Sequence, residues 1–146
     1  MKILIDADGC PVVDIAVKLA KENKIECFIL CDTSHVFEKE WATTLTFSKG
    51  ADSVDFALVN LVFPGDIVIT QDYGLAAMCL SRKAVVINQD GMEYNDGNID
   101  ALLLARHTAK KIRSSGGRLK GPPKRAAMQD KAFETALSRL IDSGQK

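Results

Sequence analysis

Lys2-Ile3-Leu4-Ile5-Asp6-Ala7-Asp8 is a short apolar run that ends in two carboxylates. A run of this length and composition is typical of a strand buried inside a sheet. Pro11 follows, and it suits the first position of a helix, where its missing N–H has no partner. Apolar residues then recur at helical spacing over residues 12–21. The change from a continuous apolar run to helical spacing predicts a strand followed by a helix, which is the first unit of an α/β fold.

The same alternation continues along the chain. Further strands are expected over residues 25–31, 43–47, 67–70 and 84–87, and further helices over 51–62, 72–81, 98–112 and 130–141. Strands separated by helices need crossover connections, so we predict a mainly parallel five-stranded sheet with helices on both faces. Residues 1–146 are expected to form a single domain, with a basic Gly/Pro loop over 114–127 before the C-terminal helix.

Composition places the chain among ordinary globular domains. It has 146 residues, of which 47% are hydrophobic and 26% charged. No apolar run is long enough to span a bilayer, so no membrane partner is expected. A carboxylate at Asp6 comes too early for a signal peptide, and we therefore expect a cytoplasmic location. The four cysteines, Cys10, Cys27, Cys31 and Cys79, form no C-x-x-C pair and are predicted to be free thiols.

Carboxylates follow most of the predicted strands. In a parallel sheet the carboxyl ends of the strands meet at one edge, where ligands bind. Several carboxylates packed together repel one another, and a divalent cation removes that penalty. Oxygen ligands without histidine or thiolate favour Mg²⁺ or Mn²⁺. The residues predicted to bind such a metal are Asp6, Asp8, Asp52, Asp55 and Asp72.

Each of these acids also has a structural alternative. Asp52 and Asp72 could be helix caps, and Asp66 and Asp90 are interpreted as turn residues. Asp6 stands apart, because it ends a buried apolar strand where a bare charge is costly. Two hydroxyl residues follow strands at the same edge: Thr70, expected to orient a carboxylate or a water, and Ser34.

Basic residues gather in the last third of the chain. No acidic residue occurs from 101 to 129. Such a strip would contact phosphates without reading sequence, and the alternative is a solvated surface. If the substrate is a polyanion, the residues expected to contact it are Arg106, Lys110, Arg113, Arg118 and Lys120.

Three segments resemble one family: Ile5-Asp6-Ala7-Asp8-Gly9-Cys10-Pro11-Val12, residues 50–55, and residues 64–76, which begin Pro-Gly-Asp-Ile-Val-Ile-Thr-Gln-Asp. Together they are similar to the YaiI/YqxD family, which is related to PIN-like domains. The resemblance implies a PIN-like three-layer α/β/α sandwich. PIN domains are mostly metal-dependent ribonucleases, and Asp6, Asp55 and Asp72 match their acids, with Asp8 and Asp52 as further candidates. After Pro123 the chain departs from the family's usual tail.

The resemblance implies a Mg²⁺- or Mn²⁺-dependent phosphodiesterase that acts on RNA, with Asp6, Asp8, Asp55 and Asp72 as catalytic residues. Two alternatives remain. Asp6-Ala7-Asp8-Gly9 and Thr70 also imitate motifs of haloacid-dehalogenase phosphatases, although only Asp90 stands where those enzymes carry a late acidic pair. The chain could also be a non-catalytic module that binds metal or nucleic acid.

Overall fold

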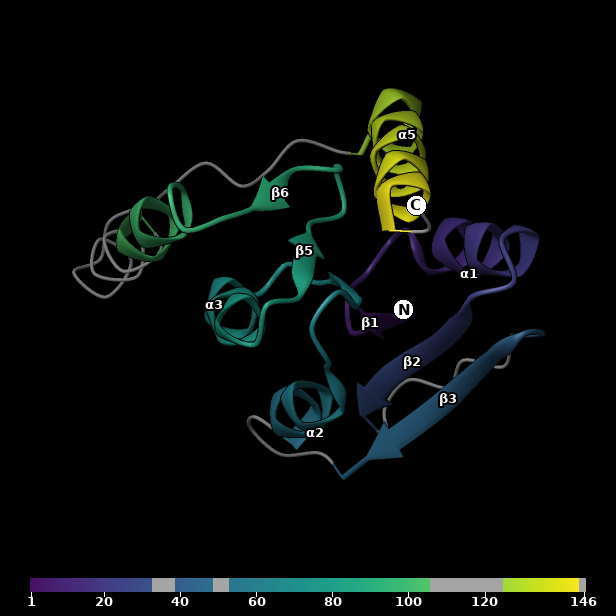
Figure 1. Cartoon of the computed structure of the whole chain (residues 1–146), viewed down its shortest axis with the longest axis horizontal. Coiled ribbons are helices and arrows are strands. Elements are labelled where there is room, and N and C mark those ends of the chain that lie inside the picture. The colour runs from purple at the N-terminus through teal and green to yellow at the C-terminus, as the bar shows by residue number, and fades with distance from the viewer. Residues whose placement is uncertain (33–38, 49–52, 106–124, 145–146) are drawn as a thin grey trace.

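A computed structural model describes residues 1–32, 39–48, 53–105 and 125–144. Their strands form one six-stranded sheet in the order β3-β2-β1-β4-β5-β6 (Figure 1). All neighbouring strands are parallel except β5 and β6. The strands are β1 (Lys2–Asp6), β2 (Glu26–Asp32), β3 (Ala42–Phe47), β4 (Ile67–Ile69), β5 (Val85–Ile87) and β6 (Glu93–Tyr94).

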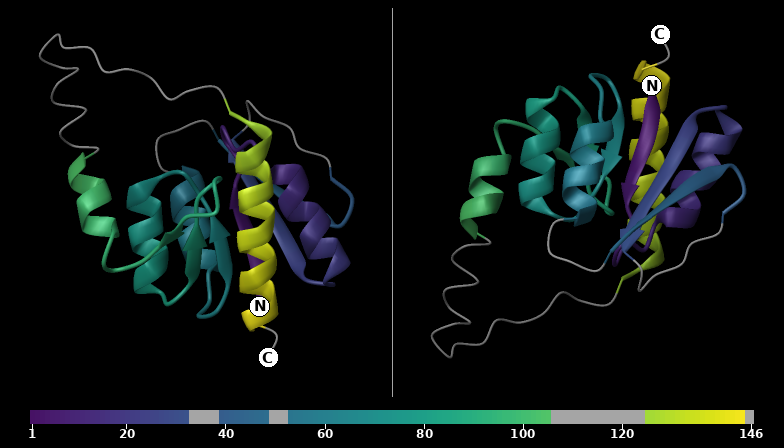
Figure 2. Two further views of the ribbon diagram at one scale, coloured as in Figure 1. Left: turned by 90° about the horizontal axis from the view of Figure 1, so that it is seen from above. Right: turned by 90° about the horizontal axis from the view of Figure 1, so that it is seen from below.

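Helices lie on both faces of this sheet (Figure 2). The helices are α1 (Val13–Glu22), α2 (Ser53–Leu61), α3 (Tyr73–Ser81) and α5 (Ala127–Gly144), and residues 99–105 are also helical. The alternating strand positions explain the two cores. Ile3 and Ile5 pack with α1 and α5 on one face, whereas Leu4 packs with α2 and α3 on the other. None of the helices in the described ranges is long and apolar enough to cross a membrane.

The α/β class and the mainly parallel sheet are confirmed, but the prediction of five strands was wrong. The sixth strand, β6, has only two residues and pairs antiparallel with β5. Two residues are too few to show an alternating pattern, so the sequence carried no signal for it. Pro11 lies in a turn before α1, which begins two residues later at Val13.

The C-terminal helix begins earlier than expected. Residue 130 was predicted as its start, and the loop before it was expected to reach residue 127, but α5 begins at Ala127. The side chain of Gln129 accepts a hydrogen bond from the backbone N–H of Ala126 at 2.7 Å, which satisfies a donor at the first turn. The earlier part of that loop, residues 114–124, and the expected helix beyond residue 105 lie outside the described residues.

Gly91 lets the turn between β5 and β6 approach α5 closely. Its φ is +87°, and a Cβ there would stand 2.8 Å from the carbonyl oxygen of Ala132 and 2.9 Å from Cβ of Ala136. Gly91→Ala should therefore lower the free energy of unfolding by about 2–4 kcal/mol, through backbone strain together with overpacking. Urea denaturation measures this loss. Gly65→Ala is the control, because Gly65 has a φ of +88° but open space around it, so only the strain of about 1 kcal/mol applies. Equal losses in both variants would contradict the close approach.

Candidate functional site

The order of the strands reverses between β1 and β4, and we refer to the carboxyl ends of these two strands as the crevice. The chain runs from β1 outward to β3 and then returns to place β4 on the other side of β1. The helices that follow β1 and β4 consequently cover opposite faces, with α1 in one core and α3 in the other. Ligands of open parallel sheets bind at such a reversal of strand order. Ile5 pairs with Ile69, so the next residues, Asp6 and Thr70, stand side by side at this crevice.

The carboxyl group of Asp6 has a raised pKa. Burial raises its pKa from the ordinary value of 3.8 to about 6, and the hydrogen bond from Thr70 opposes that rise. The charges of Asp55, Asp8 and Asp72 raise the pKa further, in that order. These three acids come from three separate parts of the chain, yet all act on the carboxyl group of Asp6. Such a concentration of like charge is typical of functional sites.

Thr70 connects β1 to the segment after β4 through two hydrogen bonds. Its side chain is buried, and its Oγ1 donates to Oδ2 of Asp6 at 2.8 Å while accepting from the backbone N–H of Asp72 at 3.0 Å. Because the hydroxyl oxygen accepts from Asp72, its proton is directed to Asp6. Thr70 was expected to orient a carboxylate or a water, and the group that its hydroxyl contacts is the carboxylate of Asp6. The hydroxyl of Tyr94, a residue that the sequence analysis missed, donates to the carbonyl oxygen of Thr70 at 3.3 Å.

Thr70→Val should lower the free energy of unfolding by about 1–3 kcal/mol, because the partly buried N–H of Asp72 loses its acceptor and Asp6 loses its donor. The pKa of Asp6 should rise further, since the lost hydrogen bond is the interaction that lowers it. Urea denaturation and NMR titration of the Asp6 carboxyl measure these changes. Thr70→Ser keeps the hydroxyl and is the control. If Thr70→Val had the same stability and the same Asp6 pKa as the parent, the Thr70 hydroxyl would neither stabilise the fold nor lower the pKa of Asp6.

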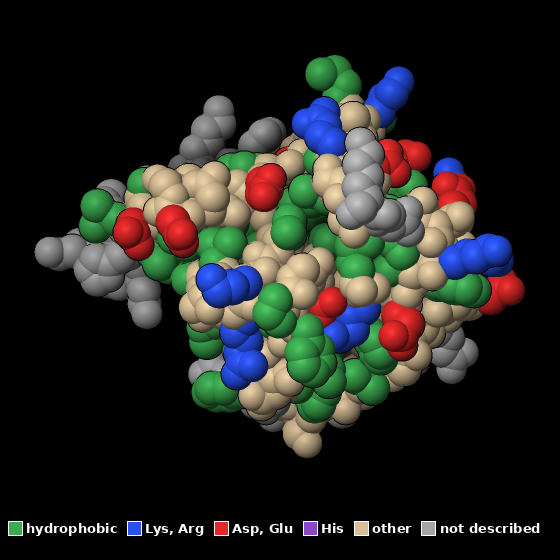
Figure 3. All heavy atoms as spheres, viewed as in Figure 1, with side chains coloured by type: hydrophobic (Ala, Val, Ile, Leu, Met, Phe, Trp, Pro, Cys, Tyr) green, Lys and Arg blue, Asp and Glu red, His purple; other side chains and the backbone are tan. Residues whose placement is uncertain are grey.

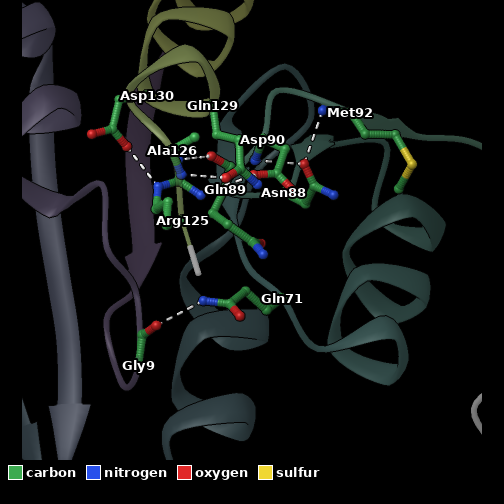
Figure 4. Close-up of polar contacts among 10 residues, drawn as sticks. All are labelled: Gly9, Gln71, Asn88, Gln89, Asp90, Met92, Arg125, Ala126, Gln129 and Asp130. Carbon is green, nitrogen blue, oxygen red and sulfur yellow. Dashed lines mark hydrogen bonds and ion pairs between the residues drawn. The ribbon is translucent and has the colours of Figure 1, made fainter. Parts of the chain in front are cut away.

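Asp72 is a helix cap, which is the structural alternative raised for it. Its Oδ1 accepts from the backbone N–H groups of Gly74 at 2.8 Å and Leu75 at 3.2 Å, at the start of α3. Asp55 lies in the first turn of α2. The amino ends of both helices, which favour negative charge, therefore point at the crevice. Gln71, between β4 and α3, donates to the carbonyl oxygen of Gly9 at 2.8 Å and ties the two loops together (Figure 4).

The described carboxylates do not form a closed metal site. Within residues 1–32, 39–48, 53–105 and 125–144, no group of three His, Cys, Asp or Glu side chains is arranged so that it could hold a metal ion. Several predicted site residues lie outside these ranges, so the structure says nothing of their positions. These residues are Ser34, Asp52, Arg106, Lys110, Arg113, Arg118 and Lys120.

Asp90 does not belong to the carboxylate group around Asp6. Its Oδ1 forms an ion pair with Nη1 of Arg125 at 2.8 Å and accepts from Nε2 of Gln129 at 3.1 Å (Figure 4). Arg125 also contacts Oδ1 of Asp130 at 2.6 Å and the carbonyl oxygen of Gln89 at 2.6 Å. The interpretation of Asp90 as a turn residue thus omitted its main role, which is to fasten the start of α5 to the end of β5.

The cysteines are free thiols, as predicted. Cys27, Cys31 and Cys79 are buried, and Cys10 is partly exposed near Asp6. Burial is the main cause that raises the pKa of Cys10 to about 11 and the pKa values of Cys27 and Cys79 to about 12. All three of these thiols therefore remain protonated near neutral pH, where a thiolate would be needed for nucleophilic chemistry or metal binding.

Comparison with known proteins identifies the family of this chain. The family model described as "Uncharacterized BCR, YaiI/YqxD family" matches residues 4–143, which include the crevice and the start of α5. The chain belongs to the YaiI/YqxD family. The resemblance found in the sequence is therefore confirmed at the level of the family.

Relatives of the YaiI/YqxD family match the chain over almost its whole length. A UPF0178 protein of Exiguobacterium sibiricum is 53% identical over 141 residues, which are 97% of this chain and 96% of that protein. A UPF0178 protein of Clostridium acetobutylicum is 49% identical over 147 residues, covering 99% of each chain. One from Natranaerobius thermophilus is 43% identical, covering 97% of this chain and 96% of its own length. No solved structure matches the chain.

Proposed function

We propose that the protein is a metal-dependent phosphodiesterase of the ribonuclease type, with Asp6, Asp8, Asp55 and Asp72 at its active site. The supporting observation is the pKa of Asp6, raised to about 6 by burial and by the charges of the other three acids at the carboxyl ends of the strands. The resemblance to PIN-like domains supports the same reaction class, because those domains use a handful of carboxylates. A likeness of fold is weaker support than the site itself.

The chemistry of the donors fits Mg²⁺ or Mn²⁺. All four side chains offer carboxylate oxygens, which hard divalent cations prefer, and the mutual repulsion around Asp6 is the penalty that a cation would remove. When bound, such an ion would offset charge on the phosphate and lower the pKa of a bound water. Because the described side chains do not converge on one point, ion binding requires that they turn inward or that Asp52 contributes.

The chain's own groups would then have separate roles. Thr70 holds the Asp6 carboxylate in one orientation, and Asp72 keeps the loop after β4 fixed to the start of α3. The amino ends of α2 and α3 favour an anionic phosphate at the crevice. Arg106, Lys110, Arg113, Arg118 and Lys120 are proposed to contact phosphates along the flanking strand of RNA.

The phosphatase alternative receives one supporting and one opposing observation. The contact between Thr70 and Asp6 joins the two motifs that imitate a haloacid-dehalogenase phosphatase. However, the late acid that such an enzyme needs would have to be Asp90, and its carboxylate is engaged by Arg125 and Gln129. We therefore favour the phosphodiesterase.

The test compares three substrates with Mg²⁺, with Mn²⁺ and with a chelator: an oligoribonucleotide, a DNA of the same sequence and a chromogenic phosphomonoester. The expected result is metal-dependent cleavage of RNA that is lost in Asp6→Asn. Asp96→Asn removes a charge from an exposed turn and should retain activity. Turnover of the phosphomonoester alone would establish the phosphatase. Binding of RNA without cleavage would establish a non-catalytic module, and absence of both would overturn the proposal.

The role of the basic residues needs its own measurement. Changing Lys110, Arg113 and Lys120 together to Gln should weaken RNA binding and lower the slope of log affinity against log salt by about 2, if all three contact phosphates of a single strand. An affinity and slope equal to those of the parent would show that these residues form an ordinary solvated surface.

A further inference from the structure

An open groove runs between α5 and the turn that joins β5 to β6. Its volume is about 540 Å³, and it begins at Asp90, at the same edge of the sheet as the carboxylates. Gly91, Ala132 and Ala136 form its floor, where the turn and the helix almost touch. The groove therefore leads away from the candidate active site along the side of α5.

Cations line the helical wall of this groove. Lys131, Thr135 and Arg139 are spaced four residues apart and are all exposed, so they form one stripe along α5. The rise of a helix separates Lys131 from Arg139 by about 12 Å. Neither cation has an ion-pair partner in the described part of the chain. Lys and Arg side chains accordingly stand out over α5 on the face drawn in Figure 3.

The acids near the stripe limit what it could bind. Asp90, at the groove's entrance, forms an ion pair with Arg125, which also pairs with Asp130. Glu134 and Asp142 lie on the other side of the stripe, in a second hollow that also contacts Lys131 and Arg139. Among the residues that line the groove, the two cations outnumber the single acid, Asp90. In the second hollow, Glu134 and Asp142 equal the same two cations in number. The rest of the groove is open and lined largely by small apolar residues and Met128, so Lys131 and Arg139 are the groups there that would attract a charged backbone.

We infer that this groove holds the backbone of single-stranded RNA where the strand leaves the active site, with Lys131 and Arg139 contacting two phosphates and Thr135 lying between them. The inference rests on the proposed function, because it assumes that an RNA strand binds at the carboxylates and continues from there toward α5. The contacts give affinity and not sequence preference, since they go to phosphates. The residues that line the groove are different from the predicted basic residues between 106 and 120.

The test measures binding of a 2′-O-methyl oligoribonucleotide, which resists cleavage, across a salt series with Mg²⁺. The double variant Lys131→Gln with Arg139→Gln should bind about tenfold more weakly at low salt and lower the log–log salt slope by about 1.4, the value for two phosphates of a single strand. Arg82→Gln with Lys83→Gln is the matched control. These two substitutions remove the same amount of charge from exposed residues at the end of α3, beside the opposite edge of the sheet. They should have little effect on binding of the oligonucleotide.

Two further results decide the inference. Glu134→Gln should strengthen binding, because it removes a negative charge beside the stripe. Cleavage of a dinucleotide, which is too short to reach the groove, should be the same in the parent and in the groove variant. If the groove variant binds the long oligonucleotide as the parent does, the inference is overturned, whether or not RNA is cleaved. If binding depends on the groove but nothing is cleaved, only the proposed activity fails.

Discussion

Asp6→Asn should raise the melting temperature of the metal-free protein at about pH 8 by about 5 °C. Burial and three neighbouring carboxylates make the ionised form of Asp6 unfavourable in the folded state, which is why its pKa rises from 3.8 to about 6. A shift of this size corresponds to about 2–3 kcal/mol of lost stability when the group is ionised. Asn keeps an oxygen that can accept from Thr70 but carries no charge. Differential scanning calorimetry in the presence of a chelator measures the change.

The higher melting temperature of Asp6→Asn relative to the parent should depend on pH, and the difference should be smaller at acidic pH. The folded parent binds a proton at Asp6 more tightly than the unfolded chain does, so this group destabilises the parent fully above about pH 6. As the pH falls from about 6 to about 4, protonation of Asp6 relieves the repulsion. The difference in melting temperature between Asn variant and parent should shrink over that range. A difference that is constant with pH would contradict the raised pKa of Asp6.

Metal should reverse the ranking of the two proteins. If Mg²⁺ or Mn²⁺ binds at the carboxylates, it stabilises the folded parent by mass action and raises its melting temperature. Asp6→Asn should lose most of that rise, because a ligand charge is gone. Asp96→Asn, at an exposed turn, should behave as the parent does with and without metal. An unchanged metal response in Asp6→Asn would remove Asp6 from the metal site.

Asp66→Ala should lower the free energy of unfolding by about 3–5 kcal/mol, the loss typical of a broken buried ion pair. Asp66 is 3% exposed and lies at the amino end of β4. Its carboxylate accepts from the ammonium of Lys2 at 2.5 Å, from the backbone N–H of Lys2 at 3.1 Å and from the backbone N–H of Phe63 at 2.8 Å. The variant leaves a cation and two N–H groups without this acceptor.

Asp14→Ala is the matched control for Asp66→Ala. Asp14 also pairs with a lysine, Lys39, at 2.6 Å, but its side chain is 80% exposed. An exposed pair contributes less than about 1 kcal/mol, because water and salt screen it. Urea denaturation of both variants should therefore give a large loss for Asp66 and a small one for Asp14. Similar small losses would show that the pair between Lys2 and Asp66 does not stabilise the fold.

Much of the architecture could be predicted because its signals are local. Every strand except β6 has a period of two or a continuous apolar run, and helices such as α1 and α5 have a period near 3.6, so a short window of residues reveals them. The carboxylates Asp6 and Asp72 could be assigned to one edge of the sheet for the same reason. Asp6 ends β1 and Asp72 comes shortly after β4, and parallel strands all end at one edge.

Contacts between distant residues were decided by the tertiary structure alone. Asp66 was interpreted as a turn residue, yet it is the buried partner of Lys2, 64 positions away. Asp6 and Thr70 are also 64 positions apart, and they touch because β4 inserts beside β1. Arg125 meets Asp90 because α5 returns to the end of β5. Periodicity determines which side of an element is buried, but the order of the strands determines which buried sides meet. That order depends on packing over the whole chain.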